Sequence, residues 1–148
     1  MSWLLKTEPN TYSIDNLKQD KKTAWDSIRN YQARNFLISM EVGDTCLIYH
    51  SNAEPPGIVG IGKVSKKAFP DPLQFEKKSD YYDEKASKEK PRWFCPEISF
   101  VKKFSRLIPL AELRESKELK NMVLLKKGSR LSVQPVSDKE LEKILELV

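Results

Sequence analysis

The chain is organised around one stretch of sequence, Ala24-Trp25-Asp26-Ser27-Ile28-Arg29-Asn30-Tyr31-Gln32-Ala33-Arg34-Asn35-Phe36. Aromatic rings, side-chain amides and two arginines alternate in it with few aliphatic residues. Trp and Tyr supply flat faces for stacking, Asn and Gln donate and accept in one plane, and Arg presents a rigid fork of donors. The stretch therefore predicts a pocket for a heterocyclic base or a phosphate. The alternative is a loop that enters a helix with half-buried aromatic side chains.

The second half of this stretch has the spacing of a helix that begins near Asn30. Apolar residues recur three and four positions apart and would form its buried face: Ala33, Phe36, Leu37 and Met40. Tyr31, Arg34 and Asn35 would share an adjoining face. Asn30 is a candidate N-cap, and the free N–H groups of a first helical turn attract anions. One helix start can thus present a ring, a cation, an amide and backbone donors to a single ligand.

The length of 148 residues predicts a single domain, 1–148, because a chain of about 150 residues supports one good core. Lysine and arginine number 26 against 21 acidic residues, which gives a net charge of +5. This excess suits a nucleic-acid partner, although solubility alone also explains it. No apolar run approaches the ~18 residues of a membrane helix, and the N-terminus does not resemble a signal peptide. We expect a soluble, cytoplasmic protein without a membrane partner.

Residues that bind metals or catalyse reactions are scarce. Cys46 and Cys95 are the only cysteines and His50 is the only histidine, so we predict no metal site, no disulfide and no cofactor. The two thiols are expected to be small buried side chains, and His50 a hydrogen-bonded structural residue. Neither a phosphate-binding glycine loop nor a dinucleotide fingerprint is present. The sequence therefore predicts no catalytic residues.

Hydrophobic periodicity and cap residues outline the other elements. Strands are expected at 3–5, 45–50, 58–64, 93–101 and 131–136, with 102–106 continuing or leaving the fourth. Helices are expected at 14–18, 109–114 and 118–125, and at the C-terminus after a capping box of Ser137 and Glu140, where the apolar stripe is Leu141, Ile144, Leu145 and Val148. Gly60 and Gly62 inside one strand predict a bend or a close backbone approach. The mixed order of strands and helices predicts an α+β fold with a curved, mostly antiparallel sheet.

The segment from residue 65 to residue 92 carries many charges, three prolines and little periodicity. A connection of this length without its own core is uncommon in a compact domain and tends to be functional or flexible. The alternative is a solvated excursion anchored by a few aromatic side chains, Phe69, Phe75, Tyr81 and Tyr82.

Five motifs, in order and spread over the whole chain, resemble those of the EVE domain family. They are Trp3-Leu4-Leu5-Lys6-Thr7-Glu8-Pro9, the stretch Trp25 to Asn35, Tyr49-His50-Ser51-Asn52 with Pro55-Pro56-Gly57, Pro91-Arg92-Trp93, and Gly128-Ser129-Arg130-Leu131-Ser132-Val133-Gln134-Pro135-Val136. The resemblance implies a PUA-like fold, a small bent β-barrel with helices around it, related to the YTH domain. It also implies a reader of modified bases in DNA or RNA, with modified cytosine in DNA as the leading ligand.

The resemblance and the residue types together predict a nucleic-acid-binding site. The base-binding pocket is expected to consist of Trp25, Ser27, Asn30, Tyr31, Arg34, Asn35, Ser51 and Asn52. Contacts to phosphates and flanking nucleotides are expected from Lys6, Arg29, Trp93, Arg130, Ser132 and Gln134. Ser27 stands where many family members carry Gly, a change that would trim the pocket or add a hydroxyl contact.

The sequence thus favours a non-enzymatic nucleic-acid reader in which Trp25 stacks on one flipped or unpaired base. One alternative is an enzyme of nucleic-acid or nucleotide metabolism that uses Lys6, Glu8 or Asp26 as acid or base. Another is a module that binds a small molecule or a protein, in which the arginines are ordinary surface charge.

Overall fold

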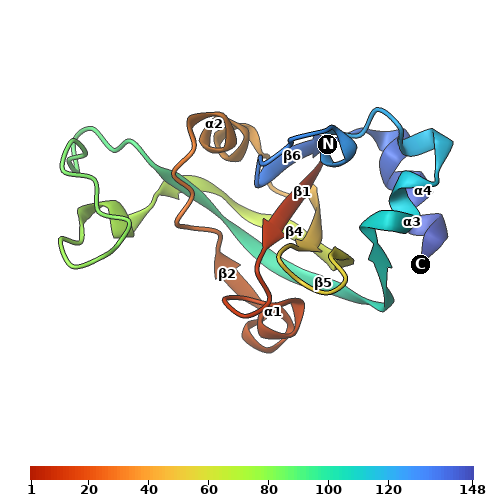
Figure 1. Cartoon of the computed structure of the whole chain (residues 1–148). Coiled ribbons are helices and arrows are strands. Elements are labelled where there is room, and N and C mark those ends of the chain that lie inside the picture. The colour runs from red at the N-terminus through yellow and green to blue at the C-terminus, as the bar shows by residue number, and fades with distance from the viewer.

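A computed structural model describes residues 1–148 and consists of one six-stranded sheet with helices on both faces (Figure 1). The strands are β1 (Ser2–Thr7), β2 (Lys22–Ala24), β3 (Thr45–His50), β4 (Gly57–Pro70), β5 (Phe94–Pro109) and β6 (Val133–Val136). Their order across the sheet is β2-β5-β4-β3-β1-β6. Only the β1–β3 pair is parallel, so the predicted mostly antiparallel α+β fold is confirmed.

The sheet bends where β4 and β5 cross the molecule. Gly60 and Gly62 of β4 allow this, because a Cβ at Gly60 would lie 2.5 Å from the carbonyl oxygen of Lys102 and one at Gly62 would lie 2.9 Å from that of Ser99. The predicted close backbone approach is therefore confirmed, and the register of β4 against β5 shifts at the same place. The curved sheet remains open, with β2 and β6 as its edges, and a helix, α2 (Tyr31–Ser39), packs against both β5 and β6.

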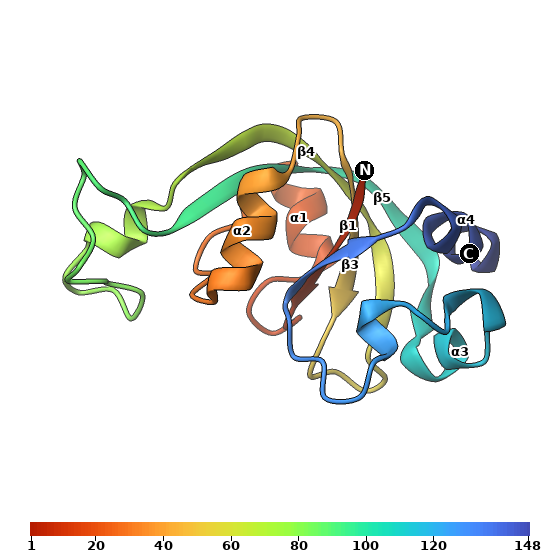
Figure 2. The same cartoon turned by 90° about the horizontal axis from the view of Figure 1, so that it is seen from above.

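Alternating residues of the strands feed two hydrophobic cores. Trp3 and Leu5 of β1 face the core beneath α1 (Ile14–Asp20) and α2, whereas Leu4 between them faces the core beneath α3 (Leu110–Arg114) and α4 (Asp138–Leu147). Figure 2 shows these two pairs of helices on opposite sides of the strands. The alternation is a direct consequence of the two-residue period of a strand.

Side-chain caps begin most of the helices as the sequence predicts. Asn30 caps α2 through Oδ1, which accepts from the Ala33 N–H at 2.9 Å, and Ser137 and Glu140 form the capping box of α4. Two expectations near the C-terminus were wrong. The helix at 118–125 is instead two 3₁₀ turns, η2 (Lys117–Leu119) and η3 (Val123–Leu125), and Leu145 and Val148 are exposed while Ile144 is buried.

The segment at 65–92 is more ordered than its composition suggests. β4 continues to Pro70, and a 3₁₀ turn, η1 (Pro72–Phe75), follows. Residues 71–93, called the arm below, project from the sheet in Figures 1 and 2. The buried amide of Gln74 closes the base of the arm, because Nε2 donates to the carbonyls of Asp71 and Trp93 and Oε1 accepts from the Arg92 and Trp93 N–H groups.

Three further expectations can be compared with the structure. Cys46 and Cys95 are buried free thiols, as predicted. His50 is structural, since its Nε2 accepts from the Ile14 N–H at 3.1 Å at the start of α1, and burial lowers its pKa. None of the helices has the length and apolarity needed to cross a membrane.

Candidate functional site

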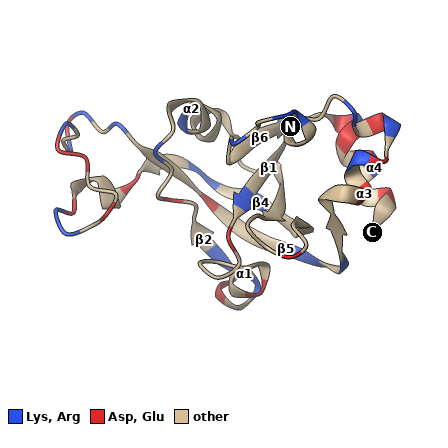
Figure 3. Cartoon of the chain, in the orientation of Figure 1, with Lys and Arg blue, Asp and Glu red and all other residues tan.

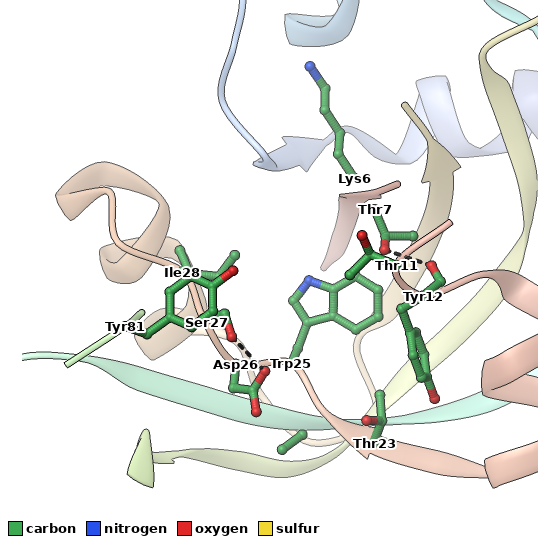
Figure 4. Close-up of a pocket in the computed structure, with 11 residues that line it drawn as sticks. Lys6, Thr7, Thr11, Tyr12, Thr23, Trp25, Asp26, Ser27, Ile28 and Tyr81 are labelled. Carbon is green, nitrogen blue, oxygen red and sulfur yellow. Dashed lines mark hydrogen bonds between the residues drawn. The ribbon is translucent and has the colours of Figure 1, made fainter. Parts of the chain in front are cut away.

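A cavity of about 310 Å³ opens where the end of β1 meets the segment that follows β2 (Figure 4). This volume lies at the lower end of the range for small-ligand sites, about 300–1,000 Å³. Eleven residues line it: Lys6, Thr7, Thr11, Tyr12, Thr23, Ala24, Trp25, Asp26, Ser27, Ile28 and Tyr81. They come from four separate parts of the chain, which the sheet order and the arm bring together.

Trp25 forms the central wall of this cavity. Its backbone N–H donates to the Pro96 carbonyl at 2.8 Å, and the Tyr12 ring meets the indole edge-on with centroids 6.3 Å apart. The indole N–H groups of Trp3 and Trp93 donate to Asp44 and Asp83, at 2.9 and 2.8 Å. The indole nitrogen of Trp25 has no protein acceptor and faces the space between Ile28 and Lys6 in Figure 4. Trp25 therefore offers a ligand both a ring and an unused donor.

Asp26 and Ser27 form the polar wall beside Trp25. The Ser27 hydroxyl donates to Asp26 Oδ1 at 3.1 Å, and the Ser27 N–H donates to Oδ2 of the buried Asp71 at 2.8 Å. Ser27 has a φ of +70°, in the left-handed region where glycine is unstrained. Burial, followed by the charge of Asp71, raises the pKa of Asp26 above its usual value.

Arg29 attaches the arm to this wall. Its guanidinium donates to Asp71 Oδ2 at 3.0 Å and to the Tyr81 carbonyl through Nε and Nη2, at 3.1 and 2.9 Å. It also lies against the rings of Tyr81 and Trp93, at 5.5 and 5.4 Å from their centroids. Most donors of the Arg29 guanidinium are therefore used inside the protein. Arg29 holds the cavity wall in position, whereas the sequence predicted a contact with phosphate.

Several residues expected in the pocket lie elsewhere. Tyr31 stacks on Trp93 with centroids 5.0 Å apart, and Arg34 covers Tyr31 and donates to Asn35 Oδ1 and to the Arg92 carbonyl. The first turn of α2 thus packs against the base of the arm. Tyr31, Arg34 and Asn35 do not line the cavity that contains Trp25 and Ser27.

Two more expected pocket residues follow β3. The Ser51 N–H donates to the Thr7 carbonyl at 3.0 Å, and Asn52 is exposed with a φ of +51°. They adjoin the β1 end that borders the cavity but do not line it. Asn30, the N-cap of α2, instead lines a neighbouring groove.

That neighbouring surface is basic. Asn30 and Arg130 line one groove of about 420 Å³, and a second groove of about 480 Å³ is lined by Lys6 and Arg114. The two grooves share the loop at 126–129. Residues 119–137 contain Lys and Arg but no acidic residue, and Figure 3 shows no red along this part of the ribbon. We call the surface formed by Lys6, Arg114, Lys126, Lys127 and Arg130 the basic ridge.

Lys6 connects the basic ridge to the cavity, because it lines both. In Figure 4 its stem starts at the cavity and its ammonium group extends away from Trp25. Burial lowers its pKa, so an anion beside it would be stabilising. Ser132 and Gln134 support the ridge: the Ser132 carbonyl accepts from the Lys6 N–H, and the buried Gln134 amide donates to the Leu131 carbonyl.

The site therefore brings together Trp25, Ser27 and Lys6, with Arg130 close by on the ridge. The sequence-based site did not include the remaining polar lining residues: Thr7, Thr11, Tyr12, Thr23, Asp26 and Tyr81. Asp26 was noted only as a possible acid or base, although its position next to Trp25 was a usable signal. Tyr81 had no such signal, since it lies 52 positions from Arg29 and reaches the cavity only through the fold.

Comparison with known proteins gives a consistent set of relatives. A family model described as EVE domain matches residues 1–147. Human thymocyte nuclear protein 1 is 42% identical over an alignment that covers 98% of this chain and 72% of the relative. A crystal structure of a Pseudomonas syringae protein is 45% identical with a TM-score of 0.95 and covers 99% of both chains. The crystal structure of human THYN1 protein in complex with 5-methylcytosine-containing DNA is 41% identical, with a TM-score of 0.92, and covers 99% of this chain and 96% of that chain.

Proposed function

This chain belongs to the EVE domain family, and we propose on that basis that it is a non-enzymatic reader that binds nucleic acid through one modified base, with modified cytosine in DNA as the leading ligand. The observation that carries the proposal is the Trp25 cavity, whose size and unused indole donor fit a single heterocyclic base. The relative crystallised with 5-methylcytosine-containing DNA supports the choice of ligand.

In this proposal the base leaves its stack and packs against Trp25. Base-to-aromatic stacking is worth about 1–3 kcal/mol per base, and it tolerates any base because every base has a π-face. Discrimination between bases with different hydrogen-bonding edges must then come from the polar groups of the wall, Asp26 and Ser27. Two points remain predictions: that the protein also binds a modified base in RNA, and that it is located in the cytoplasm.

The backbone on either side of the bound base would follow the basic ridge. Lys6 lies at the junction between cavity and ridge, so it is placed to meet the phosphate next to the bound nucleotide. Lys126, Lys127 and Arg130 come next along this surface. Such contacts hold the strand in register and carry no base information themselves.

The chemistry of the cavity favours binding over reaction. Lys6 and Asp26 line it, but Lys6 carries its ammonium group away from Trp25 in Figure 4. Glu8, the third residue considered as an acid or base, is exposed and does not line the cavity. No specific contact therefore favours an enzyme.

The proposal is tested by titrating the protein, at one fixed salt concentration, with single-stranded oligonucleotides that differ at one base. The set contains cytosine, 5-methylcytosine, 5-hydroxymethylcytosine, adenine and N6-methyladenine, in DNA and in RNA. We expect one modified base to bind at least tenfold more tightly than its unmodified parent, which corresponds to about 1.4 kcal/mol. Equal weak binding to all members would reject a modified-base reader.

Trp25→Ala is expected to abolish this preference because it removes the stacking surface. Tyr82→Ala is the matched control, since Tyr82 is an exposed aromatic residue of the arm outside the cavity. Trp25→Phe keeps a ring but removes the indole donor, and it should retain part of the affinity. Circular dichroism of each variant separates loss of the site from loss of the fold. A preference that survives Trp25→Ala in a folded protein would place the base elsewhere.

A further inference from the structure

A protein that reads 5-methylcytosine in DNA must distinguish this base from thymine, and the methyl group alone does not allow it to do so. Thymine carries the same methyl group at C5 of the pyrimidine ring, and it is present in nearly all DNA. The two bases differ at position 4, where cytosine has an amine donor and thymine a carbonyl acceptor, and at N3, which is an acceptor in cytosine and a donor in thymine. A cavity that recognised only ring and methyl would be filled by thymine.

The cavity contains one side chain suited to this distinction. Asp26 is the only carboxylate among the eleven lining residues. Oδ1 accepts from the Ser27 hydroxyl, whereas no other residue donates a hydrogen bond to Oδ2. The other polar side chains around it cannot make this distinction. Six of them carry hydroxyls, which both donate and accept and so suit either base, and Lys6 and Trp25 offer only N–H donors.

The surroundings of Asp26 favour a ligand that donates a hydrogen bond to its carboxylate. Asp26 forms no ion pair, and the guanidinium of Arg29, three residues along the chain, is bonded to Asp71. The carboxyl group is half-buried beside a second, fully buried carboxyl group. A partly dehydrated acceptor without a full set of partners gains from an incoming N–H and is penalised by an incoming carbonyl oxygen.

We propose that Asp26 is the specificity-determining residue of the cavity, and that it accepts the exocyclic amine of a cytosine-type base and rejects the thymine-type base of the same shape. The inference rests on the proposed function and adds to it the chemical edge that is read. Ser27 acts as a positioning residue, because its hydroxyl fixes Oδ1 and leaves Oδ2 for the ligand. Selection of this kind combines an attractive contact with a repulsive one.

The test compares single-stranded DNA oligonucleotides that carry 5-methylcytosine or thymine at one position, so that no base pair has to be opened. Wild-type protein should prefer 5-methylcytosine at least tenfold. Asp26→Asn has nearly the same shape but can turn an amide N–H toward a carbonyl, so the preference should fall to within about threefold, chiefly through tighter thymine binding. Asp80→Asn is the matched control because it removes one negative charge from an exposed residue outside the cavity.

A second measurement does not depend on the folding of any variant. An oligonucleotide with N4,N4-dimethyl-5-methylcytosine lacks amine hydrogens, and wild-type protein should bind it no better than thymine. Either an unchanged preference in folded Asp26→Asn, or undiminished binding of the dimethylated base, would overturn the inference. Failure of the proposed function looks different, since wild-type protein would then bind every oligonucleotide of the first titration equally weakly.

Discussion

Among single residues, Asp26 is a carboxylate whose ionised form destabilises the folded protein. Burial and the charge of Asp71 raise its pKa above the usual value of 3.8. The folded protein therefore binds this proton more tightly than the unfolded chain does. The free energy of unfolding falls as pH rises from about 3.8 through the raised native pKa, and above that window the full cost of the charged group is present.

This cost predicts that Asp26→Asn stabilises the protein while it removes selectivity. At pH 7 the variant should unfold at a higher urea concentration than wild type, and the difference should vanish below pH 3.8, where Asp26 is neutral in both states. Urea titrations at several pH values measure this directly. Asp80→Asn should show no comparable pH-dependent gain. Equal midpoints of wild type and Asp26→Asn at pH 7 would show that Asp26 is not destabilising.

At the scale of elements, the arm depends on the ion pair between Arg29 and Asp71. The side chain of Asp71 is fully buried and that of Arg29 is 21% exposed. Removal of one partner from a buried pair leaves an uncompensated charge, which typically costs about 3–5 kcal/mol. The same guanidinium holds the Tyr81 carbonyl, so its loss also frees the part of the arm that lines the cavity.

Arg29→Met is therefore expected to lower the free energy of unfolding by about 3 kcal/mol, the lower end of that range because Arg29 is partly exposed. Urea denaturation gives the stability, and hydrogen exchange should show faster exchange in the arm than in β3. Arg106→Met is the control, because its pair with Glu112 is at the surface and should contribute little. A variant as stable as wild type would mean that Asp71 is satisfied without Arg29.

Across the whole molecule, the cavity and the basic ridge are separate but adjoining surfaces. In the proposed function the cavity selects the base and the ridge attracts the backbone next to it. Lys6 alone belongs to both surfaces. Affinity and selectivity should therefore respond to different substitutions.

A triple substitution to Gln at Lys126, Lys127 and Arg130 should weaken binding to every oligonucleotide by a similar factor and leave the base preference unchanged. The slope of log affinity against log salt should shrink by about 0.7 for each lost phosphate contact to a single strand. The control removes the same charge at Lys77, Lys78 and Lys139, exposed residues outside both surfaces. If both triple variants weakened oligonucleotide binding equally, the ridge would contribute only through the net charge of the protein and not through specific phosphate contacts.

Local signals account for most of the correctly predicted elements. The caps at Asn30 and Ser137 act within three residues, and the alternation in β1 follows from the geometry of one strand. The errors arose where local signals conflict with the tertiary environment. The segment 118–125 has helical periodicity, but its chain makes two tight turns that bury Leu119, Met122 and Leu124 against the second core.

Signals between neighbouring residues were enough to predict five of the six strands, the caps at Ser13, Asn30 and Ser137, and the family, whereas the short strand β2 was not predicted. They also singled out Trp25, which lines the cavity. The tertiary structure decided which residues share the cavity. The arm supplies Tyr81, Arg29 is used to hold it, and the start of α2 turns Tyr31 toward Trp93 instead of Trp25. The physical reason is that contacts between distant segments depend on the order and curvature of the sheet, and these emerge from packing of the whole chain rather than from any one stretch of it.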